Sequence, residues 1–326
     1  MRQNEFGSKK AREMSNMVSI CCLVYNHEPF LRECFEGFVM QQTTFPIEIL
    51  VHDDASTDHS ADIIREYTAK YPDLFKPIYQ AENQYSKGVD VLSINIKRAQ
   101  GKYIALCEGD DYWTDPLKLQ KQVEFMENDI NNEYVLCFHD STMIDKDGNT
   151  IKKNIISHSD ISALELMKNK IPPTQTILFR KQCLDDGFLD FSSKAMKAGV
   201  ISGDSLLCFS LGKNGKGKYV SDISNSVYRI HGDGIWSSQS ELSQNILKYN
   251  LYTFLQKQQS STCEYYRFRR KHVAMWLTNE TSQNRCLRYL IRFYFVSVLL
   301  LVRDYDFYHI WRVTLGVLYN IGHGKS

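Results

Sequence analysis

Short apolar segments alternate with amphipathic segments through the first 140 residues, and no other feature of the sequence constrains the fold as strongly. The segments with the length and composition of strands are 18–25, 47–52, 75–80, 102–107 and 134–139. After the first of them, Pro29 precedes apolar side chains at helical spacing, namely Leu31, Cys34, Phe35 and Phe38. Strands that alternate with helices predict an α/β fold with a mostly parallel central sheet and helices on both faces.

By the pattern of its residues, the whole chain divides into three parts. Residues 1–16 are polar, residues 17–236 carry the α/β pattern, and residues 237–326 have helical spacing. Within the α/β part, the sequence DKDGN at 145–149 predicts a hairpin turn, and 195–215 predicts a single helix. We therefore expect one α/β domain followed by a helical C-terminal region.

Composition and charge narrow the class of protein. With 43% hydrophobic and 24% charged residues the chain is typical of globular proteins, and a net charge of +1 does not favour a nucleic-acid partner. The nine cysteines form no C-x-x-C pair, which indicates reduced thiols. The polar start lacks the apolar core of a signal peptide, and the longest apolar run, 293–302, falls short of the roughly 20 residues of a membrane span. These features predict a cytoplasmic location.

The C-terminal region is basic, because residues 265–326 contain ten Lys and Arg against three Asp and Glu. Its apolar residues at helical spacing are Leu287, Leu290, Ile291, Tyr294, Val298, Leu301 and Val302. A basic amphipathic helix can lie on an anionic membrane, which would make the protein peripheral at the inner face of the cell membrane. The alternative is a helix that packs back onto the catalytic domain.

Polar clusters follow three of the expected strands: YNHE at 25–28, DDASTD at 53–58 and EGDDYW at 108–113. In sheets of this type, ligands bind at the carboxyl ends of the strands, where these clusters fall. If the strand from 103 continues to 110, Glu108 and Asp110 share one face, as a Mg²⁺ or Mn²⁺ site requires, and Gly109 allows a ligand to approach the backbone. The alternative is a solvated turn before a helix that Asp115 caps.

Four segments in this order resemble the successive motifs of family 2 glycosyltransferases: VSICCLVYNHEPFLRECFEGFVMQQ, EILVHDDASTDHSADIIREY, AQGKYIALCEGDDYW and SGDSLL. The resemblance covers about residues 17–235. It implies the GT-A fold, with a nucleotide-binding half at 17–112, an acceptor half at 113–236, and an Asp-x-Asp metal motif. The family commonly has Thr or Pro where this chain has Val24.

The resemblance assigns the nucleoside to the loops after the first two strands. It implies that Tyr25 packs on the base or ribose, that Asn26 fixes the turn, and that Asp53 accepts the N3–H of a uracil, with Asp54 and Ser56 nearby. Ser56 can instead cap the next helix. In the stretch that follows, Asn83, Lys87 and Arg98 are candidates for contacts with the base or diphosphate, although the two basic side chains are equally consistent with solvated helix charges. These candidates all precede the metal motif.

The resemblance also implies a metal site and a general base. Glu108-Gly109-Asp110 takes the place of the Asp-x-Asp motif, with Glu in the first position, so that Asp110 binds the Mn²⁺ or Mg²⁺ ion and Asp111 positions the donor sugar. Asp204, in SGDSLL, falls where the family carries its general base. The alternative role for Asp204 is to cap a helix.

A last cluster, YRIHGDGIWS at 228–237, follows the expected strands. Arg229 and His231 lie two residues apart and would share one face of a strand. A neutral His231 can complete the metal site, or a charged one can meet the diphosphate, and Arg229 is a further candidate for contact with the donor nucleotide. Trp236 can form a wall of the acceptor site or fill the core.

Taken together, these residues predict an inverting, metal-dependent glycosyltransferase. Its donor would be a nucleotide-sugar, with a UDP-sugar favoured, and its acceptor a saccharide or lipid-linked saccharide in polysaccharide, O-antigen or capsule synthesis. The competing hypothesis is a sugar-nucleotide-binding or scaffold protein on the same fold with a degraded site, which Val24 and Glu108 would favour.

Overall fold

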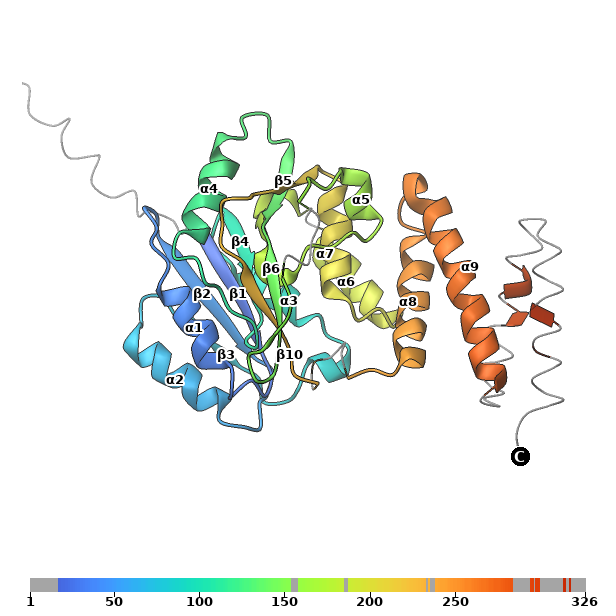
Figure 1. Cartoon of the computed structure of the whole chain (residues 1–326), viewed down its shortest axis with the longest axis horizontal. Helices are drawn as coiled ribbons and strands as arrows, with labels where there is room; N and C mark the ends of the chain where they lie inside the picture. Colours follow the sequence, from blue (N-terminus) through green and yellow to red (C-terminus); the bar gives the residue numbers. More distant parts are fainter. Residues whose placement is uncertain are drawn as a thin grey trace, which may run out of the picture. The chain divides into compact units, whose positions relative to one another are not determined.

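The computed structural model describes residues 17–153, 158–184, 187–232, 234 and 238–283, with a few residues beyond them. The chain forms two compact units, the first made of residues up to Ser193 together with Gly203–His231, and the second of Lys194–Ser202 with the chain from Gly232. Figure 1 shows the strands gathered in the first unit. The predicted boundary between residues 236 and 237 stays a prediction.

A seven-stranded sheet forms the centre of the first unit, in the order β3-β2-β1-β4-β8-β5-β9. Its strands are β1 (Val18–Val24), β2 (Ile47–Asp53), β3 (Ile78–Tyr79), β4 (Tyr103–Leu106), β5 (Tyr134–Phe138), β8 (Leu178–Arg180) and β9 (Lys216–Tyr219). Every pairing is parallel except those of β8, which runs antiparallel to both β4 and β5. The prediction of a mostly parallel sheet is confirmed.

A second, three-stranded sheet has the order β10-β6-β7. Strands β6 (Ser141–Asp145) and β7 (Thr150–Lys152) pair antiparallel around the predicted hairpin turn, and β10 (Ser226–Ile230) runs parallel to β6. Tyr112, just after the acidic segment, forms a bridge with Val227 in β10. This bridge brings β10 to the end of β4.

Helices cover both faces of the large sheet, as predicted. The first unit contains α1 (Leu31–Val39), α2 (Ser60–Lys70), α3 (Val91–Arg98), α4 (Lys118–Asn128), α5 (Ala163–Met167), α7 (Gly203–Gly212), most of α6 (Phe188–Lys197), and the short turns η1 (Tyr85–Lys87), η2 (Thr174–Thr176) and η3 (Lys181–Cys183). The single helix expected over 195–215 is wrong, because the chain breaks between α6 and α7 at Gly199, which has a positive φ of 79°. The break places Asp204 in the first turn of α7.

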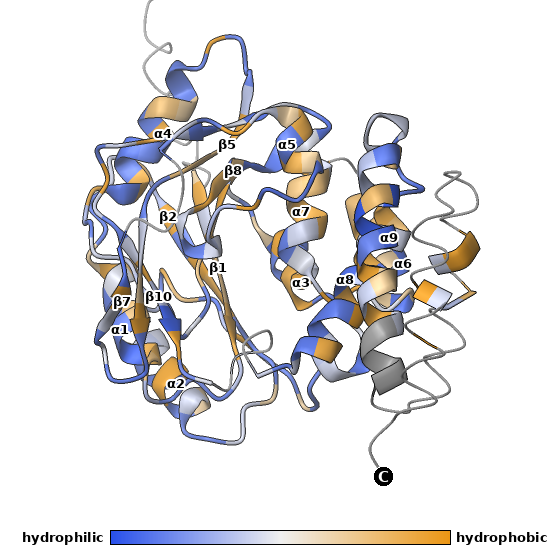
Figure 2. Cartoon of the chain, turned by 45° about the vertical axis from the view of Figure 1, so that its right-hand side comes forward, coloured by the Kyte–Doolittle hydropathy of each residue, from blue (hydrophilic) through white to orange (hydrophobic). Residues whose placement is uncertain are grey.

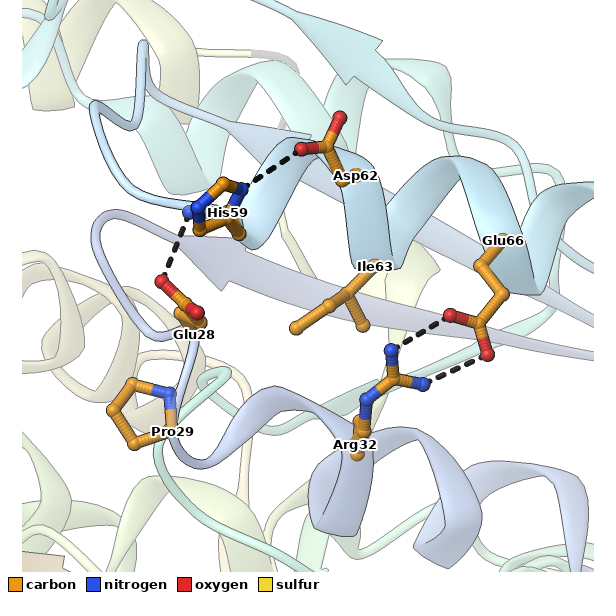
Figure 3. A pocket seen from close by; sticks show the side chains of 7 residues that line it. All are labelled: Glu28, Pro29, Arg32, His59, Asp62, Ile63 and Glu66. Carbon is orange, nitrogen blue, oxygen red and sulfur yellow. Dashed lines mark hydrogen bonds and ion pairs between the residues drawn. The ribbon is translucent and has the colours of Figure 1, made fainter.

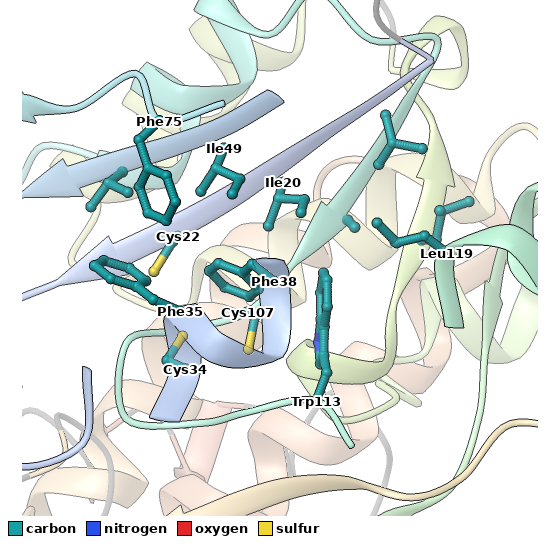
Figure 4. Packing of buried hydrophobic residues seen from close by; sticks show 14 of the residues in the cluster. Ile20, Cys22, Cys34, Phe35, Phe38, Ile49, Phe75, Cys107, Trp113 and Leu119 are labelled. Carbon is teal, nitrogen blue, oxygen red and sulfur yellow. The ribbon is translucent and has the colours of Figure 1, made fainter. Parts of the chain in front are cut away.

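Two hydrophobic clusters fill the space between the helices and the sheet. On one face, α1, α2 and α4 pack on alternate residues of β1, including Ile20 and Cys22, around Phe35, Phe38 and Trp113 (Figure 4). On the other face, α3, α5 and α7 pack on the intervening residues. Figure 2 shows the hydrophobic colouring of the central strands that this two-sided burial requires. The eight cysteines among the described residues are free thiols, and most are buried.

The second unit contains α8 (Glu241–Leu255) and α9 (Ser260–Gln283), which pack on one another around Tyr249, Ala274 and Leu277. Within the described part of the chain, none of the helices is both apolar and long enough to span a bilayer. Most of the basic amphipathic segment predicted after residue 284 lies outside the described residues, so membrane contact stays a prediction.

Candidate active site

The candidate site lies at the carboxyl end of the large sheet, where the loops after β1, β2 and β4 meet the start of α7 and the end of β10. Strands β1, β2 and β4 are parallel neighbours, so their carboxyl ends meet at one edge. All three polar clusters of the sequence follow these strands. This edge is where an α/β sheet offers space for a ligand.

The loops after β1 and β2 are joined by hydrogen bonds in both directions. Asn26 adopts a left-handed conformation with φ of 56°, which Asn tolerates better than most residues. Its backbone N–H donates to Ser56 Oγ at 3.0 Å, and its Oδ1 accepts from the backbone N–H of Thr57 at 2.7 Å. Asn26 therefore fixes the turn, as predicted, and Ser56 serves the loop of Asn26 and not a helix cap.

Similar hydrogen bonds join the two loops one turn further along the chain. The backbone N–H of Glu28 donates to Asp58 Oδ2 at 3.0 Å, and the Glu28 carboxylate accepts from the backbone N–H of His59 at 3.1 Å. The other Asp58 oxygen accepts from the backbone N–H of Ser60, the first residue of α2, at 2.9 Å. These contacts hold the two loops as one rigid surface.

Two aspartates end β2 and have different surroundings. Asp53 is 3% exposed, and its Oδ1 accepts from the backbone N–H of Ser56 at 3.0 Å. Asp54 uses both oxygens to accept from the backbone N–H groups of Gln84 and Tyr85, at 2.8 and 3.0 Å. Asp54 thus anchors the segment around η1, whereas Asp53 keeps one carboxylate oxygen for another partner. Tyr25 is 44% exposed beside them.

Two predicted ligand contacts in the segment around η1 have local partners. Asn83 Oδ1 accepts from the backbone N–H of Ser86 at 2.7 Å and so stabilises this turn. Lys87 is exposed and pairs with Glu82 on the same segment. A contact of either residue with a nucleotide stays a prediction.

Arg98 has a structural role, which corrects the predicted contact with a diphosphate. Its guanidinium donates to the carbonyl oxygens of Lys76 and Val51, at 2.7 and 2.9 Å, and to Asn95 Oδ1 at 2.9 Å. These bonds tie the last turn of α3 to the edge of the sheet. The helical spacing of the sequence did not indicate which face of α3 Arg98 occupies.

The acidic segment after β4 is a turn, which corrects the basis of the predicted metal site. β4 ends at Leu106, and the backbone N–H of Asp111 bonds to the carbonyl oxygen of Glu108 at 3.1 Å. Strand alternation therefore does not explain how Glu108 and Asp110 are placed. The helix expected at Pro116 begins at Lys118, with Asp115 Oδ1 accepting from the backbone N–H of Leu117.

Arg229 and Asp111 hold this turn against β10. The backbone N–H of Arg229 donates to Asp111 Oδ1 at 2.9 Å, and its Nε donates to the carbonyl oxygen of Asp110 at 3.2 Å. Its Nη2 forms an ion pair with Glu33 of α1 at 2.6 Å. With these contacts made, Arg229 is a positioning residue for the acidic turn, and a contact with a diphosphate stays a prediction. Trp236 lies outside the described residues.

Two histidines approach the carboxylate of Asp110. His231 Nε2 lies 3.0 Å from Asp110 Oδ2, and His27 Nε2 lies 3.9 Å from the same oxygen. Burial alone would raise the pKa of Asp110, but the two histidines outweigh it and lower that pKa. Burial also lowers the pKa of His27, and the charge of Asp110 opposes this only in part.

Glu108, Asp110, Asp111 and Asp204 converge on one small region. The Glu108 residue is exposed, but many protein atoms surround its carboxyl and displace water from it. This desolvation, and then the charges of Asp110 and Asp204, raise the pKa of the carboxyl well above the usual value. Burial raises the pKa of Tyr228 to about 12, and the charges of all four carboxylates add to this shift. Four like charges that close together indicate a place for cationic or proton-sharing chemistry.

Asp204 enters this region from the first turn of α7. Its Oδ1 accepts from the backbone N–H of Ser205 at 2.7 Å. Because its charge acts on both Glu108 and Tyr85, it lies on the same side as the acidic turn. This contact helps to orient the carboxylate.

The residues fit a divalent metal ion. Among the described residues, one group of potential ligands was found, formed by His27, Asp110 and His231, whose donor atoms lie within 4.8 Å of one another. Asp110, Glu108 and His231 were predicted as metal ligands, and this group contains Asp110 and His231 but not Glu108. Sequence reasoning missed His27, although it lies in the polar cluster after the first strand, at the same edge as Asp110.

A hollow between α1 and α2 offers no alternative site. It is lined by Glu28, Pro29, Arg32, His59, Asp62, Ile63 and Glu66 (Figure 3). Arg32 and Glu66 pair through two hydrogen bonds of 2.7 Å, and His59 lies 3.1 Å from Asp62. Because these charges satisfy one another on the protein surface, they leave little for a ligand to bind.

Comparisons with known proteins agree with this geometry. Residues 19–188 match the model of the family Glycosyl transferase family 2. An uncharacterised protein of Mycobacterium tuberculosis is 38% identical over 225 residues, which are 68% of this chain and 61% of that protein, so the chain spans less than two thirds of the relative. The Escherichia coli protein WfaP, named as a UDP-Glc:alpha-D-GlcNAc-diphosphoundecaprenol beta-1,3-glucosyltransferase, is 35% identical over 40% of this chain and 48% of its own.

The fold also matches a solved structure. TarS 1–349 of S. aureus, in complex with UDP-GlcNAc, superposes with a TM-score of 0.61 over 94% of this chain and 89% of that one, at 14% identity. At this identity the likeness shows the fold alone, which is the GT-A fold.

Proposed function

The chain belongs to glycosyltransferase family 2, and from this premise we propose that it transfers a sugar from a UDP-sugar to a hydroxyl group of a saccharide or lipid-linked saccharide, with inversion at the anomeric carbon. The activity in the name of WfaP, which combines a UDP-sugar with a diphosphoundecaprenol-linked acceptor, supports these substrate classes. Assembly of a cell-surface polysaccharide is the process that such an acceptor would serve.

One observation carries the proposal. Four carboxylates from two distant segments, Glu108, Asp110 and Asp111 after β4 and Asp204 on α7, act on one another at the carboxyl edge of the sheet. A binding protein without catalysis would have little use for this mutual repulsion. A transferase needs one carboxylate near a cation and another near the acceptor hydroxyl.

Each residue then has a role that its contacts allow. The second oxygen of Asp53 accepts the N3–H of the uracil, and Tyr25 packs against the base or ribose. Asp110 and His231 would hold a divalent ion, which would supply positive charge to the leaving diphosphate. Asp204, held by the backbone of Ser205, accepts the proton of the acceptor hydroxyl as its oxygen attacks the face opposite the diphosphate.

Turnover of nucleotide-sugars tests the proposal. The full chain is incubated with UDP-, GDP- and dTDP-sugars, Mn²⁺ or Mg²⁺, and lipid-linked or free saccharides, and the released nucleoside diphosphate is measured. NMR of the product then reports whether the anomeric configuration inverts. Binding of UDP without release from any donor would favour the sugar-nucleotide-binding protein instead.

A further inference from the structure

The turn after β4 contains a buried polar atom that no hydrogen bond satisfies. Asp110 is 9% exposed, and its Oδ1 has no hydrogen-bond partner. The Nδ1 atom of His27, in the loop after β1, is also buried without a partner, but it lies against Gly109, and it is Nε2 that approaches Asp110. Buried polar atoms of folded proteins are almost always paired, so the unpaired oxygen of Asp110 points to a bound ion or another ligand.

The distances suit one ion shared by three side chains. Donor atoms bonded to one metal at about 2.0–2.2 Å lie no more than about 4.4 Å apart. His231 and His27 lie 3.0 and 3.9 Å from Asp110 Oδ2, and all three donors lie within 4.8 Å. A shift of a few tenths of an ångström would bring the whole group within bonding range.

The fold holds His27 in this position before any ion binds. Its backbone N–H donates to Ser60 Oγ at 2.9 Å, which joins the loop after β1 to the start of α2. Its ring lies over Gly109, where an added Cβ would come within 2.8 Å of His27 Nδ1. The lack of a side chain at position 109 therefore makes room for His27, which corrects the expectation that it makes room for a ligand.

We propose that His27 is a third protein ligand of the metal, which completes a site of two imidazoles and one carboxylate. Imidazole nitrogens favour first-row transition metals, whereas Mg²⁺ prefers oxygen ligands and water. The site therefore takes Mn²⁺ in preference to Mg²⁺, and three protein ligands leave coordination positions open. Only the use of those positions by a diphosphate rests on the proposed function.

Metal binding by the full chain tests the proposal without turnover. Calorimetric titration with Mn²⁺ and with Mg²⁺, in the absence of nucleotide, compares the natural protein with His27→Ala and with the matched control His59→Ala. His59 lies in the same pair of loops, but its side chain is 76% exposed and faces away from Asp110, toward Asp62. We expect the Mn²⁺ affinity of His27→Ala to fall about 10- to 100-fold, with a smaller change for Mg²⁺ and none in the control.

Pulsed EPR of bound Mn²⁺ gives a second readout, because each imidazole ligand contributes a nitrogen coupling. Two coupled histidines are expected in the natural protein and one in His27→Ala. Gly109→Ala keeps the imidazole but displaces it, so it should weaken Mn²⁺ binding to an intermediate degree and serves if His27→Ala does not fold.

Unchanged Mn²⁺ affinity and unchanged nitrogen coupling in His27→Ala would overturn the proposal. So would a natural protein that binds Mg²⁺ as tightly as Mn²⁺. Two coupled histidines in a protein that turns over no nucleotide-sugar would support the ligand and contradict only the proposed transferase activity, so the two failures are distinguishable.

Discussion

The two sides of the binding edge use their polar groups in opposite ways. In the loops after β1 and β2, polar side chains bond to backbone groups of the neighbouring loop, as Asn26 and Glu28 do. In the turn after β4, Asp110 keeps a buried oxygen without a partner, and Glu108 lies among like charges. Apart from His27 and one oxygen of Asp53, the polar groups described for the first side are bonded within the protein, whereas the turn after β4 keeps an unpaired carboxylate oxygen.

This difference separates residues that stabilise the loops of the site from residues that are available to bind a ligand. A satisfied polar group stabilises the loop it holds, and its loss is felt in folding. An unsatisfied carboxylate destabilises the empty protein, and its loss is felt in binding or catalysis. Substitutions on the first side should therefore lower stability, and substitutions on the second side should lower binding or turnover, as the following experiments test.

Asp110→Asn should have the largest effect. The amide keeps the shape of the side chain but removes the charge that holds the cation, so we expect turnover to fall about 10³-fold or more and Mn²⁺ binding to be lost. The melting temperature of the metal-free protein should not fall. Asp62→Asn, at an exposed position on α2, is the control. A variant that unfolds but retains turnover per folded molecule would show that Asp110 stabilises the fold and does not bind the cation.

Asp204→Asn should lower the turnover number by about 10²- to 10³-fold, because an amide cannot accept the proton of the acceptor. Its oxygen can still accept from the backbone of Ser205, so the first turn of α7 should be preserved. Binding of UDP and Mn²⁺, measured by calorimetry, should be unchanged. Equal losses of UDP affinity and turnover would argue against a base and for a role in donor binding.

Lys118 offers a test inside the core, where a charged group is buried with few partners. Its ammonium donates to Gln122 at 2.7 Å and lies 4.1 Å from the centre of the Trp113 ring, and burial lowers its pKa to about 7. Between pH 7 and roughly 10.5 the unfolded chain holds a proton that the folded protein has lost, so stability should rise with pH in this window.

Lys118→Met should remove most of this rise and increase the free energy of unfolding at pH 7, by on the order of 1–3 kcal/mol. Urea unfolding of both proteins at pH 7 and pH 9.5 measures the difference and cancels the other titrating groups. A variant less stable than the natural protein at pH 7 would show that the contacts with Gln122 and Trp113 outweigh the cost of burial.

Asn26→Ala should have the smallest effect on turnover and a clear effect on folding. It removes the bond to Thr57 and places Ala, which tolerates the left-handed region less well than Asn, at a φ of 56°, at a cost of about 1–2 kcal/mol. Asn26→Gly tolerates the conformation and should lose less. Denaturant unfolding measures both variants, and Mn²⁺ affinity should stay constant. A loss of Mn²⁺ affinity without destabilisation would erase the distinction between the two sides.

The sequence predicted the architecture because its signals are local. Strand lengths, the hairpin after β6 and the buried face of α1 follow from short patterns, and parallel strands place their polar carboxyl ends at one edge. Asp53 and Asp110 were therefore expected at this edge from strand ends alone, whereas Asp204 was expected there only from the family resemblance. The break between α6 and α7 was missed, because Gly199 reads equally well as an interior helical residue.

The fine geometry of the site could not be predicted because it depends on contacts between distant segments. Strand alternation placed Glu108 beside Asp110, but β4 ends two residues before Glu108, and the turn is oriented by Arg229 from β10. His27 becomes a neighbour of Asp110 only through the pairing of β1 with β4. Arg98 was predicted to contact a ligand because it is basic and precedes the metal motif. In the structure it instead donates to a carbonyl oxygen of the sheet, a contact that the local sequence does not reveal.

The hydrogen bonds that lace the first two loops have a consequence for the thermodynamics of donor binding. A nucleoside that meets loops already ordered by Asn26, Asp54 and Asp58 need not immobilise them, so association loses little conformational entropy there. If a nucleoside binds here as proposed, association should then be fast, because no loop has to reorder first.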